Sequence, residues 1–116
     1  MQEVSGQIGS RKIFENDKVI MWYFELAPGE ETVMHKHERS YMWYALQGAP
    51  LDCTGLGGED LGVFDVPDNS VFNIRADGDI LTVLEGPGAE GIEFPATHKA
   101  KNAGNQNYVE ILVEFK

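Results

Sequence analysis

Two of the three histidines of the chain, His35 and His37, are separated by a single residue. On a β-strand, residues two apart point to the same face, so both imidazoles are expected to aim into one space. The residues at 32–34 suit a strand, and the Pro-Gly pair at 28–29 is a turn signal. If the fold brings the distant His98 alongside the pair, the three imidazoles form a site suited to a divalent transition metal.

A neutral imidazole is a borderline donor that suits Fe(II), Mn(II), Ni(II), Zn(II) and Cu(II). Three protein ligands leave coordination positions open, as in a catalytic site, whereas a structural zinc site is usually closed by four ligands, often cysteines. The single cysteine, Cys53, excludes an intramolecular disulfide and is only a remote candidate for a fourth ligand. The plain alternatives are a solvated His35 and His37 pair on an exposed strand and a loop position for His98.

The elements that must hold these residues are short strands. Apolar or alternating runs recur along the chain, separated by Gly, Pro, Asn and Asp, and no segment shows a convincing helical pattern. Many short strands at regular spacing indicate an antiparallel sandwich or barrel, so the expected fold class is all-β. No linker or low-complexity segment interrupts residues 1–116, which predicts one domain. Besides the strand with the histidine pair, strands are expected at residues 19–26, 41–46, 51–54, 61–66, 71–74, 80–85, 92–94 and 108–115.

The first strong strand, residues 19–26, is apolar on both faces, and such a strand is usually covered on both faces. We expect one face in the barrel and the other against a second subunit, which predicts a homodimer, or against an overlying N-terminal segment. A larger internal core layer would explain the pattern equally well. The two faces consist of Ile20, Trp22, Phe24 and Leu26 and of Val19, Met21, Tyr23 and Glu25.

The charge balance of the chain restricts its partners. Nineteen acidic and nine basic residues give a formal net charge of -10, which argues against binding the phosphate backbone of a nucleic acid or an anionic membrane. No apolar run approaches the roughly 20 residues that span a bilayer. Residues 1–6 lack the basic start and apolar core of a secretory signal, so a cytoplasmic protein is expected.

The spacing around the histidine pair resembles the first motif of the cupin superfamily, with Tyr41 where that motif has a glutamate. Residues 95–102 resemble the end of the second cupin motif, in which a histidine is followed by three residues and an asparagine. Here the proline stands closer to the histidine than in the family, and the glycine between them is missing. The resemblance runs from Val19 to Phe115. The matching pattern reads Gly29-x5-His35-x-His37-x3-Tyr41-x6-Gly48 in the first motif and Pro95-x2-His98-x3-Asn102 in the second.

The resemblance implies a small single-domain cupin, built as an antiparallel double-stranded β-helix, or jelly roll. It also implies His35, His37 and His98 as metal ligands. Three-histidine cupins include oxygenases that use Fe(II), so Fe(II) is favoured as the cofactor, with Zn(II), Mn(II) or Ni(II) as alternatives. Tyr41 is neutral at pH 7 and binds a metal poorly unless deprotonated. The metal would therefore keep its full double charge for an anionic or chelating ligand.

The predicted function is that of a metal-dependent enzyme acting on a small polar or anionic molecule, as a dioxygenase-type oxidoreductase. Tyr41 is the candidate catalytic residue, and Glu25 and Glu110 are alternatives for handling a proton. Three other functions stay open. They are an isomerase or lyase on Zn(II), Mn(II) or Ni(II), a non-catalytic module that binds a metal or small ligand, and a metal-free barrel with a structural role. Fold does not decide among them.

Several polar residues have competing roles. A carboxylate from another strand could complete the metal site, although Glu38 is the least expected donor because the residue next to His37 faces the other way. Arg75 could anchor a carboxylate but is expected on the surface, and Asn102 is expected in a turn rather than in contact with a ligand. Trp43 falls on the histidine face if the strand period holds, where it lines a pocket or fills the barrel. The carboxylates considered are Glu25, Glu38, Glu85 and Glu110.

Overall fold

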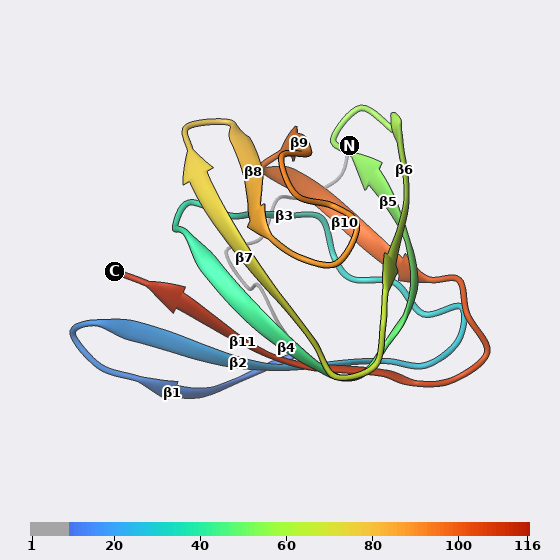
Figure 1. Cartoon of the computed structure of the whole chain (residues 1–116), viewed down its shortest axis with the longest axis horizontal. Helices are drawn as coiled ribbons and strands as arrows, with labels where there is room; N and C mark the ends of the chain where they lie inside the picture. The colour runs from blue at the N-terminus through green and yellow to red at the C-terminus, as the bar shows by residue number, and fades with distance from the viewer. Residues whose placement is uncertain (1–9) are drawn as a thin grey trace.

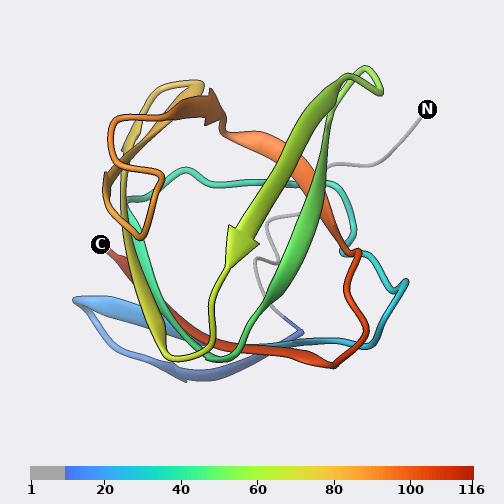
Figure 2. The ribbon, with the colours of Figure 1, turned by 45° about the vertical axis from the view of Figure 1, so that its right-hand side comes forward.

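The computed structural model describes residues 10–116 of the 116-residue chain, and these residues form eleven β-strands and no helix (Figure 1). The strands make two antiparallel sheets that curve around a common interior (Figure 2). This arrangement confirms the predicted all-β jelly-roll fold. No helix that could cross a membrane occurs in residues 10–116. The interpretation of residues 1–6 concerns a segment outside the described residues, and the cytoplasmic location stays a prediction.

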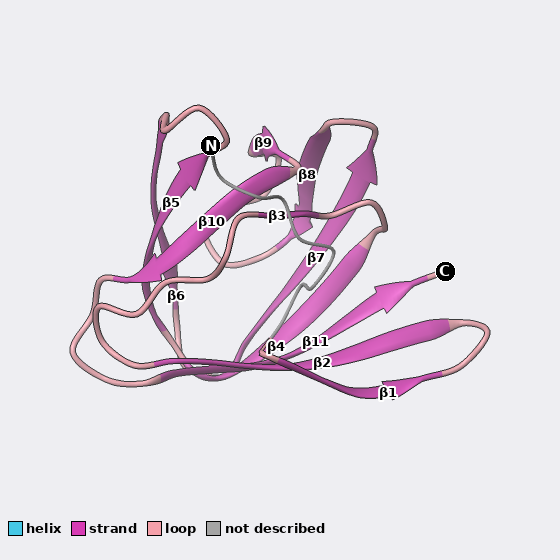
Figure 3. Ribbon diagram, turned by 180° about the vertical axis from the view of Figure 1, so that it is seen from behind, coloured by secondary structure: helices cyan, strands magenta, loops and turns pink. Residues whose placement is uncertain are grey.

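The larger sheet has seven strands in the order β1-β2-β11-β4-β7-β8-β9, and the smaller has four in the order β3-β10-β5-β6 (Figure 3). Strand β11, the last in the sequence, pairs with β2 on one side and β4 on the other. The strands of the larger sheet are β1 (Arg11–Glu15), β2 (Val19–Leu26), β4 (Tyr41–Gln47), β7 (Ser70–Asp77), β8 (Ile80–Glu85), β9 (Glu93–Pro95) and β11 (Tyr108–Phe115). Those of the smaller sheet are β3 (His35–Lys36), β5 (Ala49–Gly55), β6 (Asp60–Val66) and β10 (Thr97–Asn102).

The predicted strands are present, but two further strands, β1 and β10, were not expected from the pattern. Strand β1 is exposed along its whole length, so burial imposes no alternation of apolar residues on it. Strand β10 does alternate, but its buried positions are His98, Ala100 and Asn102 rather than large apolar residues. The histidine strand, β3, has only two residues. Strands β1 and β10 do not follow the apolar pattern because pairing with a neighbouring strand, rather than burial of large apolar side chains, holds them extended.

Strand β2 places one face of residues 19–26 inside the barrel. Trp22 and Phe24 are 8% and 7% exposed and pack in the core with Leu112 of β11. Burying an apolar side chain of this size contributes about 1.5–3 kcal/mol. On the other face, Met21 and Tyr23 are half-buried, so this face forms the outer surface of the larger sheet. The homodimer expected to use that surface stays a prediction.

The backbone geometry requires glycine at two positions of the first motif. Gly29 has a φ of 84°, in the left-handed region that favours glycine, and its amide donates to the carbonyl oxygen of Asn102 over 2.8 Å. Gly48 joins β4 to β5, and a Cβ there would lie 1.9 Å from the carbonyl oxygen of Val66. Only a glycine permits this close passage of two backbones, through which the chain leaves the larger sheet and enters the smaller one.

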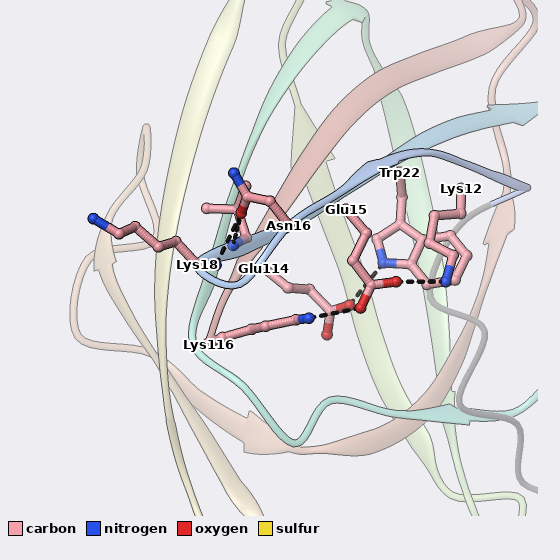
Figure 4. Close-up of polar contacts among 8 residues, drawn as sticks. Lys12, Glu15, Asn16, Lys18, Trp22, Glu114 and Lys116 are labelled. Carbon is pink, nitrogen blue, oxygen red and sulfur yellow. Dashed lines mark hydrogen bonds and ion pairs between the residues drawn. The ribbon is translucent and has the colours of Figure 1, made fainter.

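The hairpin of β1 and β2 is joined to the C-terminal residue by charged contacts (Figure 4). The Nζ atoms of Lys12 and Lys116 lie 2.7 and 2.6 Å from the two carboxylate oxygens of Glu15. Within the hairpin turn, the side-chain oxygen of Asn16 accepts hydrogen bonds from two backbone N–H groups at 2.8 and 2.9 Å, a common way for asparagine to close a turn. These contacts lie at the edge of the larger sheet that is formed by β1.

Candidate metal centre

The pairing of β3 with β10 brings the three histidines together. His35 lies directly opposite His98 in the antiparallel register, and side chains of opposed residues project from the same face of a sheet. The amide of His37 donates to the carbonyl of Ala96 at 2.9 Å, which keeps the chain extended beside β10 after β3 ends. All three imidazoles therefore point into the barrel, where the histidines are 3–7% exposed.

The ligand atoms of the three histidines all lie within 4.8 Å of one another. The Nε2 atoms of His35 and His37 are 3.2 Å apart. Two nitrogens that each lie about 2.1 Å from one ion, at an angle of roughly 100°, have about this separation. The structure therefore places His98 beside the pair and on a strand, which excludes the alternatives of a solvated pair and a loop histidine.

Backbone carbonyls orient two of the rings. The Nδ1 of His35 lies 2.9 Å from the carbonyl oxygen of Val33, and the Nδ1 of His98 lies 2.8 Å from that of Pro95. Because a carbonyl oxygen can only accept, each Nδ1 must carry the proton, and each Nε2 then presents its lone pair to the site. The Nδ1 of His37 is buried and has no hydrogen-bond partner in the described part of the chain.

Burial keeps the imidazoles neutral. It lowers the pKa of His35 to about 4, with the nearby charge of His98 as a second cause. Burial likewise lowers the pKa of His37 well below its usual value, and the charges of His35 and His98 add to this effect. Burial also lowers the pKa of His98, although its hydrogen bond to Pro95 acts in the opposite direction. The neutral imidazole is the form that binds a metal, so the cluster is in its ligating form at physiological pH.

The donor set fits a divalent transition metal with open coordination positions. Among residues 10–116, no cysteine or carboxylate joins the three-histidine cluster. Glu25, Glu38 and Glu85, considered above as further ligands, are exposed, and the buried Glu110 also lies outside the cluster. Three borderline nitrogen donors suit iron, manganese, nickel or zinc. A structural zinc site closed by four ligands is not formed by these residues.

Tyr41, the first residue of β4, stacks on the ring of His37, with ring centroids 4.1 Å apart and planes at 13°. It is 2% exposed. Burial raises its pKa well above the usual value, and the charges of Glu110 and Cys53 add to this effect. The hydroxyl group is therefore a neutral phenol at physiological pH, which can form hydrogen bonds but binds a metal poorly. The catalytic role of Tyr41 stays a prediction.

The histidines line a cavity of about 80 Å³ between the two sheets. Its wall is mainly apolar and includes Phe24, Trp43 and Phe94, as in sites that bind small organic molecules. Trp43 lines the pocket, and its ring is stacked on that of Phe72 with centroids 4.7 Å apart. Cys53 also lines the cavity, but burial raises the pKa of its thiol to about 12, which leaves the thiol protonated and unreactive.

Glu110 is the carboxyl group of this cavity wall. It lies on β11, where it pairs with Phe24 of β2 and Ala45 of β4. The hydroxyl of Tyr108 donates a hydrogen bond to its Oε1, and burial raises the pKa of Glu110 to about 8 even though that hydrogen bond acts to lower it. The sequence contains a signal for this burial, because Glu110 shares one face of its strand with Tyr108 and Leu112.

Two other polar residues considered above, Arg75 and Asn102, do not line the cavity. Arg75 is exposed on β7, as expected. Asn102 was expected in a turn, but it ends β10 and is fully buried. Its side-chain amide donates to the carbonyl oxygens of Leu26 and Gln106 at 2.9 and 2.8 Å. Through these backbone partners, Asn102 joins the end of β2 to the loop that precedes β11.

Several solved structures, two of them described as cupins, resemble the chain along most of its length. A cupin domain from Bordetella pertussis is 19% identical, with a TM-score of 0.62, and the match covers 96% of this chain and 99% of that one. A cupin superfamily protein from Desulfitobacterium hafniense is 15% identical, with a TM-score of 0.52 and coverages of 90% and 72%. A conserved protein of unknown function from Streptococcus pyogenes is 17% identical, with a TM-score of 0.53 and coverages of 98% and 79%.

Neither a family model nor a curated protein matches the sequence. At identities below 20%, likeness to these structures establishes the fold but no activity. Their likeness agrees with the two curved antiparallel sheets of this chain. The protein is a small cupin-fold protein with a candidate three-histidine metal site.

Proposed function

We propose that this protein is a metal-dependent enzyme acting on a small polar or anionic molecule, with Fe(II)-dependent dioxygenase chemistry as the first candidate. The observation that carries the proposal is the buried cluster of His35, His37 and His98, which no carboxylate joins among the described residues. Three neutral ligands leave the double charge of a metal uncompensated, which favours an anionic or chelating ligand. When bound, Fe(II) would supply redox chemistry with O2 and open positions for such a ligand.

The chain's own residues have distinct tasks in this proposal. The carbonyls of Val33 and Pro95 hold two imidazoles in the ligating orientation, and such partners typically change metal affinity by about 10–100-fold when lost. The aromatic wall of the cavity, with Trp43 and Phe94, excludes water from a bound molecule. In this proposal the neutral phenol of Tyr41, whose ring stacks on His37, donates a hydrogen bond to an anionic group and holds a proton there.

Metal analysis of protein purified without chelator or added metal tests this proposal. We expect one divalent metal per chain in the wild type and less than a tenth of that amount in His37→Ala. Lys36→Ala is the matched control, because Lys36 lies between the histidines but pairs outward with Asp79 at 3.2 Å. Stoichiometric iron with oxygen uptake in a substrate screen supports the dioxygenase. Wild-type protein that takes up no metal even when iron, zinc, manganese or nickel is added would refute the proposal.

The second candidate is a non-catalytic protein that binds a metal or small ligand. The observation that favours it is the protonation state of the groups near the histidines, because burial raises the pKa values of both Tyr41 and Cys53. Neither group is then a ready proton acceptor beside the metal. Stoichiometric metal and ligand binding without turnover would select this function. Zinc, manganese or nickel with turnover but no oxygen uptake would instead select an isomerase or lyase.

A further inference from the structure

The cavity has two chemically different walls. His35 and His98 belong to the smaller sheet, whereas Glu110 lies on β11 of the larger sheet. All three line the same cavity, so a molecule that binds at the histidines also meets the wall that carries Glu110. The remainder of the lining is mostly aliphatic and aromatic. Polar recognition in this cavity is therefore concentrated at few points, as is usual for small-molecule sites.

Glu110 has hydrogen-bonding capacity that the protein does not use. It is 5% exposed, and the Tyr108 hydroxyl is its hydrogen-bond partner among the described residues, through Oε1. No lysine or arginine in the described chain lines the cavity, so no cation of the protein lies there to neutralise the carboxylate. A buried carboxylate without a cationic partner destabilises a fold. Such a departure from the rules of stable packing is expected where a residue serves function.

A second polar group nearby also lacks a protein partner. The indole Nε1 of Trp43 is buried without a hydrogen bond within residues 10–116. Trp43 lies opposite Leu112 in the ladder of β4 and β11, and Glu110 is the next residue along the same face of β11. Two polar groups without a full set of protein partners among the described residues, the carboxyl of Glu110 and the buried indole Nε1 of Trp43, thus lie on neighbouring strands of the larger sheet.

We infer that the cavity recognises a short bifunctional molecule, with an anionic end at the three-histidine site and an amine at Glu110. This inference rests on the proposed function, because the anionic end requires a metal held by the histidines. The mainly apolar remainder of the lining suits a few methylene groups, and a cavity of about 80 Å³ has room for few heavy atoms. The amine, as ammonium, donates to the free Oε2 of Glu110. A proton carried by Glu110 before binding passes to solvent if the amine arrives as ammonium, or to the amine if it arrives neutral.

The test uses Co(II)-loaded protein and three pairs of probes. Each of 3-aminopropionate, 4-aminobutyrate and 5-aminopentanoate is compared with its unsubstituted carboxylate, and binding is followed by the visible spectrum of the Co(II) ion. Hydrogen bonds between charged groups are among the stronger ones in proteins, so we expect at least one amino carboxylate to bind roughly tenfold more tightly than its partner, which corresponds to about 1.4 kcal/mol. Glu110→Gln should bind the plain carboxylates as before and lose this preference.

Glu114→Gln is the matched control, because Glu114 is also buried on β11 but accepts a hydrogen bond from the Trp22 indole at 2.7 Å (Figure 4). This control should keep the preference for the amine. If wild-type protein shows no preference in any pair, the inference is overturned, and this result does not depend on folding of a variant. A preference that persists in Glu110→Gln also overturns it, because the amine then binds the metal directly. Failure to load Co(II) or any other metal overturns the proposed function and the inference together.

Discussion

The buried carboxyl group of Glu110 makes a quantitative prediction about stability. Burial raises its pKa from 4.5 to about 8 in the folded protein. Between these two values the native state keeps a proton that the unfolded state has lost, so the free energy of unfolding falls as pH rises. A difference of about 3.5 pKa units corresponds to a loss on the order of 5 kcal/mol from pH 4.5 to pH 8. This is a large share of the 5–15 kcal/mol typical of a domain.

Glu110→Gln removes this dependence, because glutamine resembles the protonated acid and can still accept the hydrogen bond from Tyr108. Urea unfolding of metal-free protein from pH 5 to pH 8.5 measures the effect. The variant should be more stable than the wild type at pH 8, and the gap should close toward pH 5. Glu90→Gln, at an exposed position, should follow the wild type. Parallel curves for wild type and Glu110→Gln would refute the reasoning, since Glu110 would then titrate alike in both states.

Three other outcomes follow from the structure. Metal-free protein should also lose stability as pH falls from 6.5 toward 4, because the pKa of His35 is lowered to about 4 and only the unfolded state takes up the proton; this costs about 3 kcal/mol. Bound Zn(II) should raise the thermal stability without removing this loss, because the metal keeps the native imidazoles unprotonated. Tyr41→Phe should keep the metal, as elemental analysis will show, and lower turnover about 100-fold if the hydroxyl handles a proton; unchanged turnover would leave Tyr41 a packing role beside His37. Gly48→Ala should destabilise the fold by about 2 kcal/mol or more in urea, because its Cβ would lie 1.9 Å from a backbone oxygen, whereas Gly57→Ala meets only the flexible Glu59 side chain and should be tolerated.

Much of the fold follows from local patterns. Pro, Gly, Asn and Asp mark the turns, and the run of β-branched and aromatic residues around Trp22 and Phe24 marks a strand. Which face of that strand is buried was shown by the structure. The patterns fail at β1, which is exposed throughout, and at β10, whose inner positions carry His98, Ala100 and Asn102. In both strands hydrogen bonding to a neighbouring strand replaces hydrophobic burial as the cause of extension, and that cause leaves little trace in composition.

The histidine pair shows what the sequence determines by itself. Residues two apart on an extended chain share a face, so the spacing of His35 and His37 predicts two converging imidazoles before any tertiary contact is known. The spacing of the glycines around them marks the tight passages of the backbone, at Gly29 by conformation and at Gly48 by close approach.

The tertiary structure alone decided which distant residues join the pair. His98 lies opposite His35 because of the register between β3 and β10, and Glu110 faces the same cavity because β11 lies between β2 and β4. A two-residue period specifies the direction of a side chain along one strand, but it carries no information about which strand lies beside it. Pairing between distant segments depends on how the whole chain buries its apolar surface. The resemblance to the cupins named His98 as a ligand, but only the tertiary structure established that His98 lies beside the pair and that Glu110 faces the same cavity.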